Sequence, residues 1–320
     1  MKNRVFAAAA VLAATAVPAS AQANSCAAGF TQDACQKAVD VYQYLAPQLG
    51  TAITGGNATL GQGGALGGPG HLSLGVRVNA VKGTLPQVDD PSATPVLTGA
   101  RATAYPTKDA YIPMPTIDGA LGIFKGIPLS LTNVGGIDAL VSASYIPKVD
   151  RSDVSIDPDN PVKFGYGVRI SALQESIVSP GISFTYLKRD LPVLSLTGAS
   201  SNSTLHIDDL TEKTTAWRLV ASKSFILFGL AAGYGQDSYK SSASANATIS
   251  GQTSSTISVA QDMTRSNMFA DLSLNFPVFK LIGEIGQVSG GTAPTTVNTF
   301  PAKGIVDSRL YASVGFRLSW

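Results

Sequence analysis

Seven charged residues recur at alternate positions of segments with strand-like periodicity, and these side chains are the best placed for binding chemistry. They are Arg77, Lys163, Arg169, Arg218, Lys280, Glu284 and Arg317. Residues two apart on a strand share a face, so each of these charges falls on the polar face of its segment. If the segments close into a barrel, the charges line a predominantly basic lumen. His71, which begins the first such segment, is expected at an interface or in the same lumen.

Two interpretations of these charges remain open. They could pair across neighbouring strands and hold the lumen closed. They could instead form a path or site for an anionic or amphipathic ligand that carries a carboxylate.

No other cluster makes a convincing catalytic or metal site. His206 lies close to Asp208 and Asp209, but no motif places a nucleophile beside it. The run 157–161, Asp-Pro-Asp-Asn-Pro, lacks the length and final Glu of a calcium-binding EF-hand loop. GxSxG is absent. We therefore predict no catalytic residue, no metal and no cofactor, and a lipid-modifying enzyme is only the third functional hypothesis.

Alternating apolar residues extend through most of the chain from residue 71. The segment HLSLGVRVNAVKG has apolar residues at every second position, and VKFGYGVRISAL repeats the pattern. Segments of this length match the 9–11 residues of a tilted strand that crosses a bilayer. Counting them predicts an all-β, antiparallel transmembrane barrel of about 12–14 strands over residues 71–320. The segment 110–138 contains prolines unsuited to a central strand, so we expect an inward-folded element or an irregular rim there.

Composition favours a membrane barrel over a soluble β-sandwich. Charged residues make up only 14% of the chain, and it contains 32 glycines. The polar faces carry mostly Gly, Ser and Tyr, as a crowded lumen would. Aromatic residues at strand ends could lie at the bilayer interfaces. They are Tyr105, Tyr145, Tyr186, Trp217, Tyr234 and Trp320.

The first 70 residues divide into two parts. Residues 1–23 have a basic start, an apolar run and small residues at the end, so we predict a cleaved signal peptide and export to the bacterial outer membrane. Without them the formal charge is zero, which argues against a nucleic-acid partner. In residues 24–70 we expect a short periplasmic amphipathic helix and a glycine-rich, plug-like segment. Cys26 and Cys35 are expected to form a disulfide, with a two-cysteine metal site as the weaker alternative.

The end of the chain resembles the insertion signal of bacterial outer-membrane β-barrels. In YASVGFRLSW the matching residues include Gly315, Phe316, Leu318 and Trp320, although Trp stands where Phe is commoner. The resemblance implies recognition by the barrel-insertion machinery and a lipid environment. More loosely, GGNATLGQGG before the first strand is similar to the long-chain fatty-acid transporter (FadL-like) family. That resemblance implies binding or passage of a small hydrophobic or amphipathic molecule. A non-transporting structural or surface-interaction barrel is the alternative.

Overall fold

The computed structural model describes residues 25–88, 100–129, 131–151, 154–200 and 202–320. The expected signal peptide, residues 1–23, lies outside the described residues. None of the described helices is long and apolar enough to cross a membrane.

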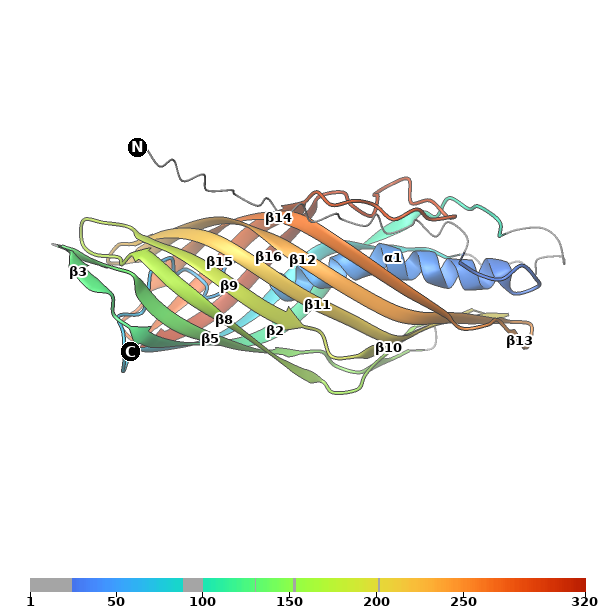
Figure 1. The fold of residues 1–320 in the computed structure, drawn as a ribbon, viewed down its shortest axis with the longest axis horizontal. Helices are drawn as coiled ribbons and strands as arrows, with labels where there is room; N and C mark the ends of the chain where they lie inside the picture. The colour runs from blue at the N-terminus through green and yellow to red at the C-terminus, as the bar shows by residue number, and fades with distance from the viewer. Residues whose placement is uncertain (1–24, 89–99, 130, 152–153, 201) are drawn as a thin grey trace, which may run out of the picture.

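The described strands form a closed, antiparallel β-barrel (Figure 1). Each ring strand pairs with two neighbours, and the pairing of β11 with β12 completes the circle. The ten ring strands are β1 (Leu72–Pro86), β2 (Thr107–Phe124), β5 (Gly136–Tyr145), β8 (Val162–Leu173), β9 (Gly181–Asp190), β11 (Ser203–Ser224), β12 (Phe228–Ile249), β14 (Ile257–Asn275), β15 (Phe279–Ser289) and β16 (Arg309–Ser319).

Four shorter strands extend the same sheet beyond the ring, and two form a separate hairpin. The extensions are β6 (Val149–Asp150), β7 (Val154–Pro158), β10 (Leu194–Ala199) and β13 (Gln252–Thr253). The hairpin is β3 (Ile127–Leu129) with β4 (Thr132–Val134). The described sheet therefore contains fourteen strands, which equals the upper limit of the predicted 12–14. The barrel itself closes with ten of them. Sequence periodicity does not separate ring strands from extensions, because both alternate.

Closure joins the last strand to the first. Val78 pairs with Val314 in the middle of the β1–β16 ladder. At its end the N–H of Leu72 donates to the carbonyl of Trp320 at 2.8 Å, and the N–H of Trp320 donates back at 3.0 Å. This pairing closes the barrel and leaves neither strand with a free edge.

The two ends of the barrel differ. One end, here called the turn end, carries the connections 125–135, 174–180, 225–227 and 276–278 and the C-terminus. The other, the loop end, carries 87–106, 146–161, 191–202, 250–256 and 290–308. Long loops on one rim and short turns on the other are typical of outer-membrane barrels, in which the short turns are periplasmic.

A band of exposed apolar side chains surrounds the barrel near the turn end. Val76 is 53% exposed, Phe164 76% and Ile285 71%, although all lie in paired strands. Trp217, Tyr186 and Tyr234 border the band on its loop-end side. Apolar residues so exposed on every wall need a covering other than water. The prediction that Tyr105 lies at a bilayer interface is wrong. Its side chain is fully buried and packs near Phe300, because residues 100–106 fold over the lumen.

Above the band, three neighbouring strands continue as a tall polar wall. β11 and β12 have 22 residues each and β14 has 19, whereas β5 and β9 have 10. The Ser- and Thr-rich stretch between Tyr239 and Asn267 is therefore mostly part of the ring strands β12 and β14.

The expectation of an inward-folded element or irregular rim over 110–138 is wrong for β2, which is a regular wall strand. Its residues Pro113 and Pro115 pair with β1, but the ladder to β5 begins only at Thr116. Proline lacks an N–H donor and is tolerated where one side of a strand is an edge. Both prolines lie in that single-sided part of β2.

Helix α1 (Gln32–Thr54) lies inside the barrel, toward the loop end (Figure 1). It packs on β11, β12 and β1, and its buried residues include Gln36, Asp40 and Gln48. The sequence predicts a periplasmic helix followed by a plug-like segment, and in the structure the helix lies inside the barrel. A helix with polar residues on every side suits a lumen that is itself polar. Residues 55–70 continue from the helix to the turn end; we call residues 25–70 the plug.

Candidate functional site

Buried ion pairs line the inner face of the barrel wall beside the plug. Asp118 on β2 forms ion pairs with two arginines, with Arg77 Nε at 2.9 Å and with Arg189 Nη2, which also donates a hydrogen bond, at 2.8 Å. Separate pairs join Arg169 to Asp138 at 2.8 Å and Arg218 to Asp237 at 2.6 Å. Single carboxylates that serve one or two guanidinium groups leave N–H donors for other acceptors.

The plug backbone supplies those acceptors. Arg77 donates to the carbonyl of Asn57 at 2.7 Å, and Arg189 donates to that of Thr54 at 3.0 Å. Arg218 donates to the carbonyls of Gly55 and Gly56, each at 3.0 Å. Arg317 likewise donates to the carbonyl of Leu60. Four arginines from four different strands therefore hold plug carbonyls.

Two carboxylates hold the N–H side of the same segment. Asp271 and Glu284 lie directly opposite each other on β14 and β15, and both are buried. Glu284 accepts from the backbone N–H of Asn57 at 2.7 Å, and Asp271 accepts from its side-chain amide at 2.8 Å. The N–H of Gly61 also donates to Asp271 at 2.8 Å. Asn57 is thus gripped by acceptors on one side and by Arg77 on the other.

Glycines let the plug approach the wall this closely. A Cβ at Gly56 would lie 2.5 Å from the Glu284 carboxyl carbon, and one at Gly63 would lie 2.6 Å from the backbone nitrogen of Ser222. At Gly63 the Cβ would meet backbone, so only glycine fits there, whereas at Gly56 the Glu284 carboxylate would have to move away from the N–H of Asn57. Gly315 on the wall is similar, since its Cβ would lie 2.5 Å from Leu60 Cδ1.

The loop end is closed by residues that cover the helix. Asp40 accepts from the backbone N–H of Asn298 at 2.7 Å and from its side-chain amide at 2.8 Å. Tyr44 stacks on Phe300 with ring centroids 4.2 Å apart. Burial raises the pKa of the Asp40 carboxyl, against the opposing effect of the hydrogen bonds from Asn298. The covering loop is therefore attached to the helix and not only to the barrel rim.

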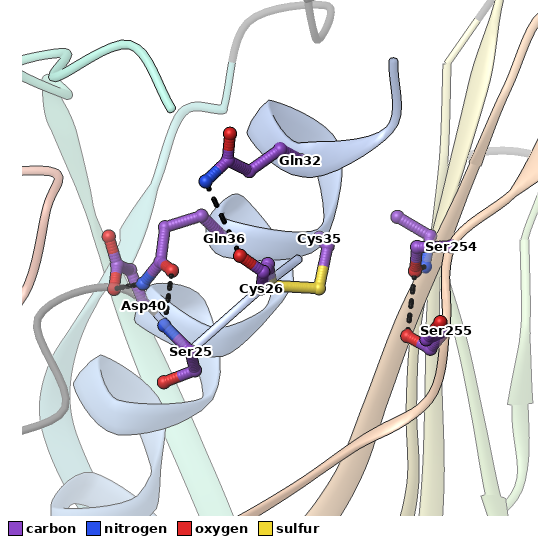
Figure 2. The surroundings of a disulfide bond; sticks show 9 residues. Ser25, Cys26, Gln32, Cys35, Gln36, Asp40, Ser254 and Ser255 are labelled. Atoms are coloured by element: carbon purple, nitrogen blue, oxygen red, sulfur yellow. Dashed lines mark hydrogen bonds between the residues drawn. A yellow bond between two sulfur atoms is a disulfide. The ribbon is translucent and has the colours of Figure 1, made fainter. Parts of the chain in front are cut away.

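A disulfide fixes the start of the helix (Figure 2). Cys26 and Cys35 are bonded, with their Cα atoms 6.0 Å apart. Gln32 donates from its side-chain amide to the carbonyl of Cys26 at 3.3 Å, and Gln36 accepts from the N–H of Ser25 at 3.2 Å. The residues that precede α1 are thus folded back on its first turns, at the loop end.

A small cavity lies between plug and wall near β1 and β16. The cavity bounded by Leu60, Arg77, Asp118 and Phe316 has a volume of about 10 Å³, room for about one water molecule. A hollow of about 200 Å³ beside the disulfide, lined by Thr31, Ser254 and Ser255, lies at the loop end. The space along the ion pairs is taken by the plug itself.

The lumen brings together most of the residues predicted to line it. Arg77, Arg169, Arg218, Glu284 and Arg317 are buried. Four of them hydrogen-bond to the plug, and Arg169 pairs with Asp138, which accepts from the N–H of Leu66. Lys163 and Lys280 lie on the lumen-facing register but are partly exposed. His71 does not belong to this set: it precedes β1 and is exposed at the turn end.

The other histidine, His206, lies on β11 between Thr197 of β10 and Asn246 of β12. His206 Nδ1 lies 3.3 Å from Thr197 Oγ1. Among the described residues, no three His, Cys, Asp or Glu side chains form a group that could hold a metal ion.

The sequence reasoning missed the partners of the predicted arginines. Arg189 continues the inward alternation of Ser183, Thr185 and Leu187, so extending the strand past Lys188 would have found it. Asp118 lies in the proline-containing β2, and Asp237 lies in the long β12. Asn57 lies in a glycine-rich segment, where no periodicity or motif in the sequence indicates that it contacts the wall.

No protein-family model matches the sequence, and no curated protein matches it. Among solved structures, the chain is similar to the Ralstonia pickettii toluene transporter TbuX at 12% identity, covering 84% of this chain and 92% of that one with a TM-score of 0.30. It is also similar to a mutant of the monoaromatic hydrocarbon channel TodX at 10% identity, covering 74% and 68% with a TM-score of 0.31. Ail, the attachment invasion locus protein of Yersinia pestis, shows 9% identity over 79% and 99% with a TM-score of 0.20. These TM-scores are low, so the assignment of a closed β-barrel depends on the strand pairing of this chain alone.

Proposed function

We propose that the protein is an outer-membrane barrel that binds or passes a small molecule when its plug is displaced. The main support is a set of hydrogen bonds in which arginine and asparagine side chains of the wall donate to backbone carbonyls of residues 52–60. These contacts are polar, so water or an oxygen-rich ligand can replace each of them when the segment moves. A carboxylate would satisfy the same guanidinium donors more strongly than a carbonyl does.

The apolar band supports the membrane position. Side chains such as Leu74, Val314 and Leu272 are about half exposed and would be covered by acyl chains. In this orientation the turn end faces the periplasm, and the last strand, with Phe316 and Leu318 on its outer register and Trp320 after it, is engaged by the barrel-insertion machinery.

A non-transporting, surface-interaction barrel is the second candidate. It is favoured by the filled lumen and by the tall polar wall of β11, β12 and β14. In that case the ion pairs and the plug serve stability alone.

Uptake into proteoliposomes separates the two. The purified full-length mature chain would be compared with a variant lacking residues 51–70, with a carboxylate-bearing amphipath and a neutral aromatic hydrocarbon as probes. The proposed function predicts a measurable uptake rate for at least one probe in the full-length chain, and an altered rate in the deletion variant. Rates equal to those of protein-free liposomes in both proteins would support the surface-interaction barrel.

A further inference from the structure

We propose that the outer face of β9, β11 and β12 binds the phosphate group of a lipid in the leaflet nearest the loop end. The proposal rests on the membrane position given above but not on passage through the lumen. It concerns side chains that point away from the plug.

Three lysines point outward on adjacent strands. Lys213 lies between the fully buried Glu212 and the buried Thr214, so its own side chain faces outside. Lys240 lies in the same way between Tyr239 and Ser241 on β12. Lys188 is flanked by the buried Leu187 and Arg189 on β9. The strand register brings these three together: Lys213 pairs directly with Lys240, and Lys188 pairs with Thr215, two residues from Lys213.

A directly opposed pair of like charges is unfavourable in a sheet unless something neutralises it. Asp190 is opposite Lys213 on β9, and Asp262 is opposite Lys240 on β14. Neither carboxylate forms an ion pair with these lysines within the described residues, and the patch carries one more positive than negative charge. By contrast, the outward Lys82 on β1 is ion-paired with Asp109 at 3.4 Å.

The height of the patch fits a lipid phosphate. Directly below it, Trp217 packs against Phe184 and Tyr234, with ring centroids 6.1 and 5.9 Å away. Aromatic clusters of this kind lie at the level of lipid headgroups. Lys213 is four residues farther along β11, roughly 10 Å above Trp217 for a strand tilted about 40°. Acyl chains would contact the apolar band below the aromatic cluster, and a phosphate attached to them would reach the lysines.

The test measures lipid retention by native mass spectrometry of the detergent-purified mature chain. The probes are a bis-phosphorylated lipid A and phosphatidylcholine, each doped into the micelles, with inorganic phosphate as a competitor. The test variant carries both Lys213→Gln and Lys240→Gln, and Lys82→Gln is a control outside the patch. The test variant removes two outward positive charges and the control one, and every substitution keeps a polar side chain.

We expect the wild-type chain and Lys82→Gln to retain lipid A at least tenfold more than phosphatidylcholine, and the double variant to lose that preference. Equal retention of the two lipids by the wild-type chain would overturn the proposal, as would an unchanged preference in the double variant. Displacement of lipid A by millimolar inorganic phosphate would show a free-anion site and would also overturn it. The lysines point away from the lumen, so this test is independent of transport. A chain that shows no uptake in the liposome experiment could still retain lipid A, and the two proposals can therefore fail separately.

Discussion

Arg218 and Asp237 form a buried ion pair at 2.6 Å between strands β11 and β12, and both side chains are completely inaccessible to solvent. The same guanidinium group donates to the carbonyls of Gly55 and Gly56. One side chain therefore joins the wall of the barrel to the plug.

Removing one partner of this pair should destabilise the barrel strongly. Arg218→Met leaves the Asp237 carboxylate buried without its cation, which we expect to cost about 3–5 kcal/mol of unfolding free energy. Replacing both residues with apolar ones should cost less than the single change, because no charge remains unpaired. Urea unfolding in detergent, followed by tryptophan fluorescence, measures both. A double variant less stable than Arg218→Met would be inconsistent with the buried-charge explanation.

A methyl group at Gly63 should displace the plug from β11. Its Cβ would meet backbone atoms of Ala221 and Ser222, which cannot rotate away. We expect Gly63→Ala to increase hydrogen exchange in residues 55–70 and to raise ion conductance in planar bilayers severalfold. Gly198→Ala is the matched control, since a Cβ there has open space and the backbone conformation is ordinary. Equal exchange in the two variants would mean that the contact at Gly63 does not hold the plug.

Loss of the disulfide should loosen only the start of the plug. The bond between Cys26 and Cys35 closes a short loop, so we expect about 2–3 kcal/mol of local stabilisation. Cys26→Ser with Cys35→Ser should raise hydrogen exchange near residues 25–36 while the heat-modifiable band of the barrel in gel electrophoresis stays. Loss of that band would show that barrel closure itself depends on the disulfide.

Asp40 should make stability depend on pH. Burial raises its pKa above the ordinary value of 3.8, so in mildly acidic solution the folded chain holds a proton there that the unfolded chain has lost. Its contribution to stability therefore falls as the pH rises through that range. We expect the Tm of the wild-type chain, relative to that of Asp40→Asn, to decrease from about pH 4 to pH 8. A constant difference between the two Tm values would contradict the raised pKa.

Alternation predicted the barrel, its closure and five of the lumen residues, because lipid-facing and lumen-facing positions differ in polarity along each strand. The position of α1 could not be predicted in this way. An amphipathic helix such as Gln32–Thr54 indicates only that one face is covered, and a polar lumen buries Gln36 and Asp40 as well as the apolar face. The grip on Asn57 depends on residues more than 200 positions away, Asp271 and Glu284, whose spatial proximity follows only from the strand register.

Ala65 and Gly136 give the most direct test that plug movement opens the lumen. A Cβ at Gly136 would lie 2.8 Å from the Cβ of Ala65, close enough for Ala65→Cys with Gly136→Cys to form a disulfide after a small shift. The measurement is single-channel conductance of this variant in planar bilayers, first oxidised and then reduced, so that the same molecules serve as their own control. The native disulfide between Cys26 and Cys35 is replaced by serines beforehand. We predict opening events under reducing conditions and none in the oxidised state. Identical conductance in the two states, whether open or closed, would contradict a lumen gated by residues 25–70.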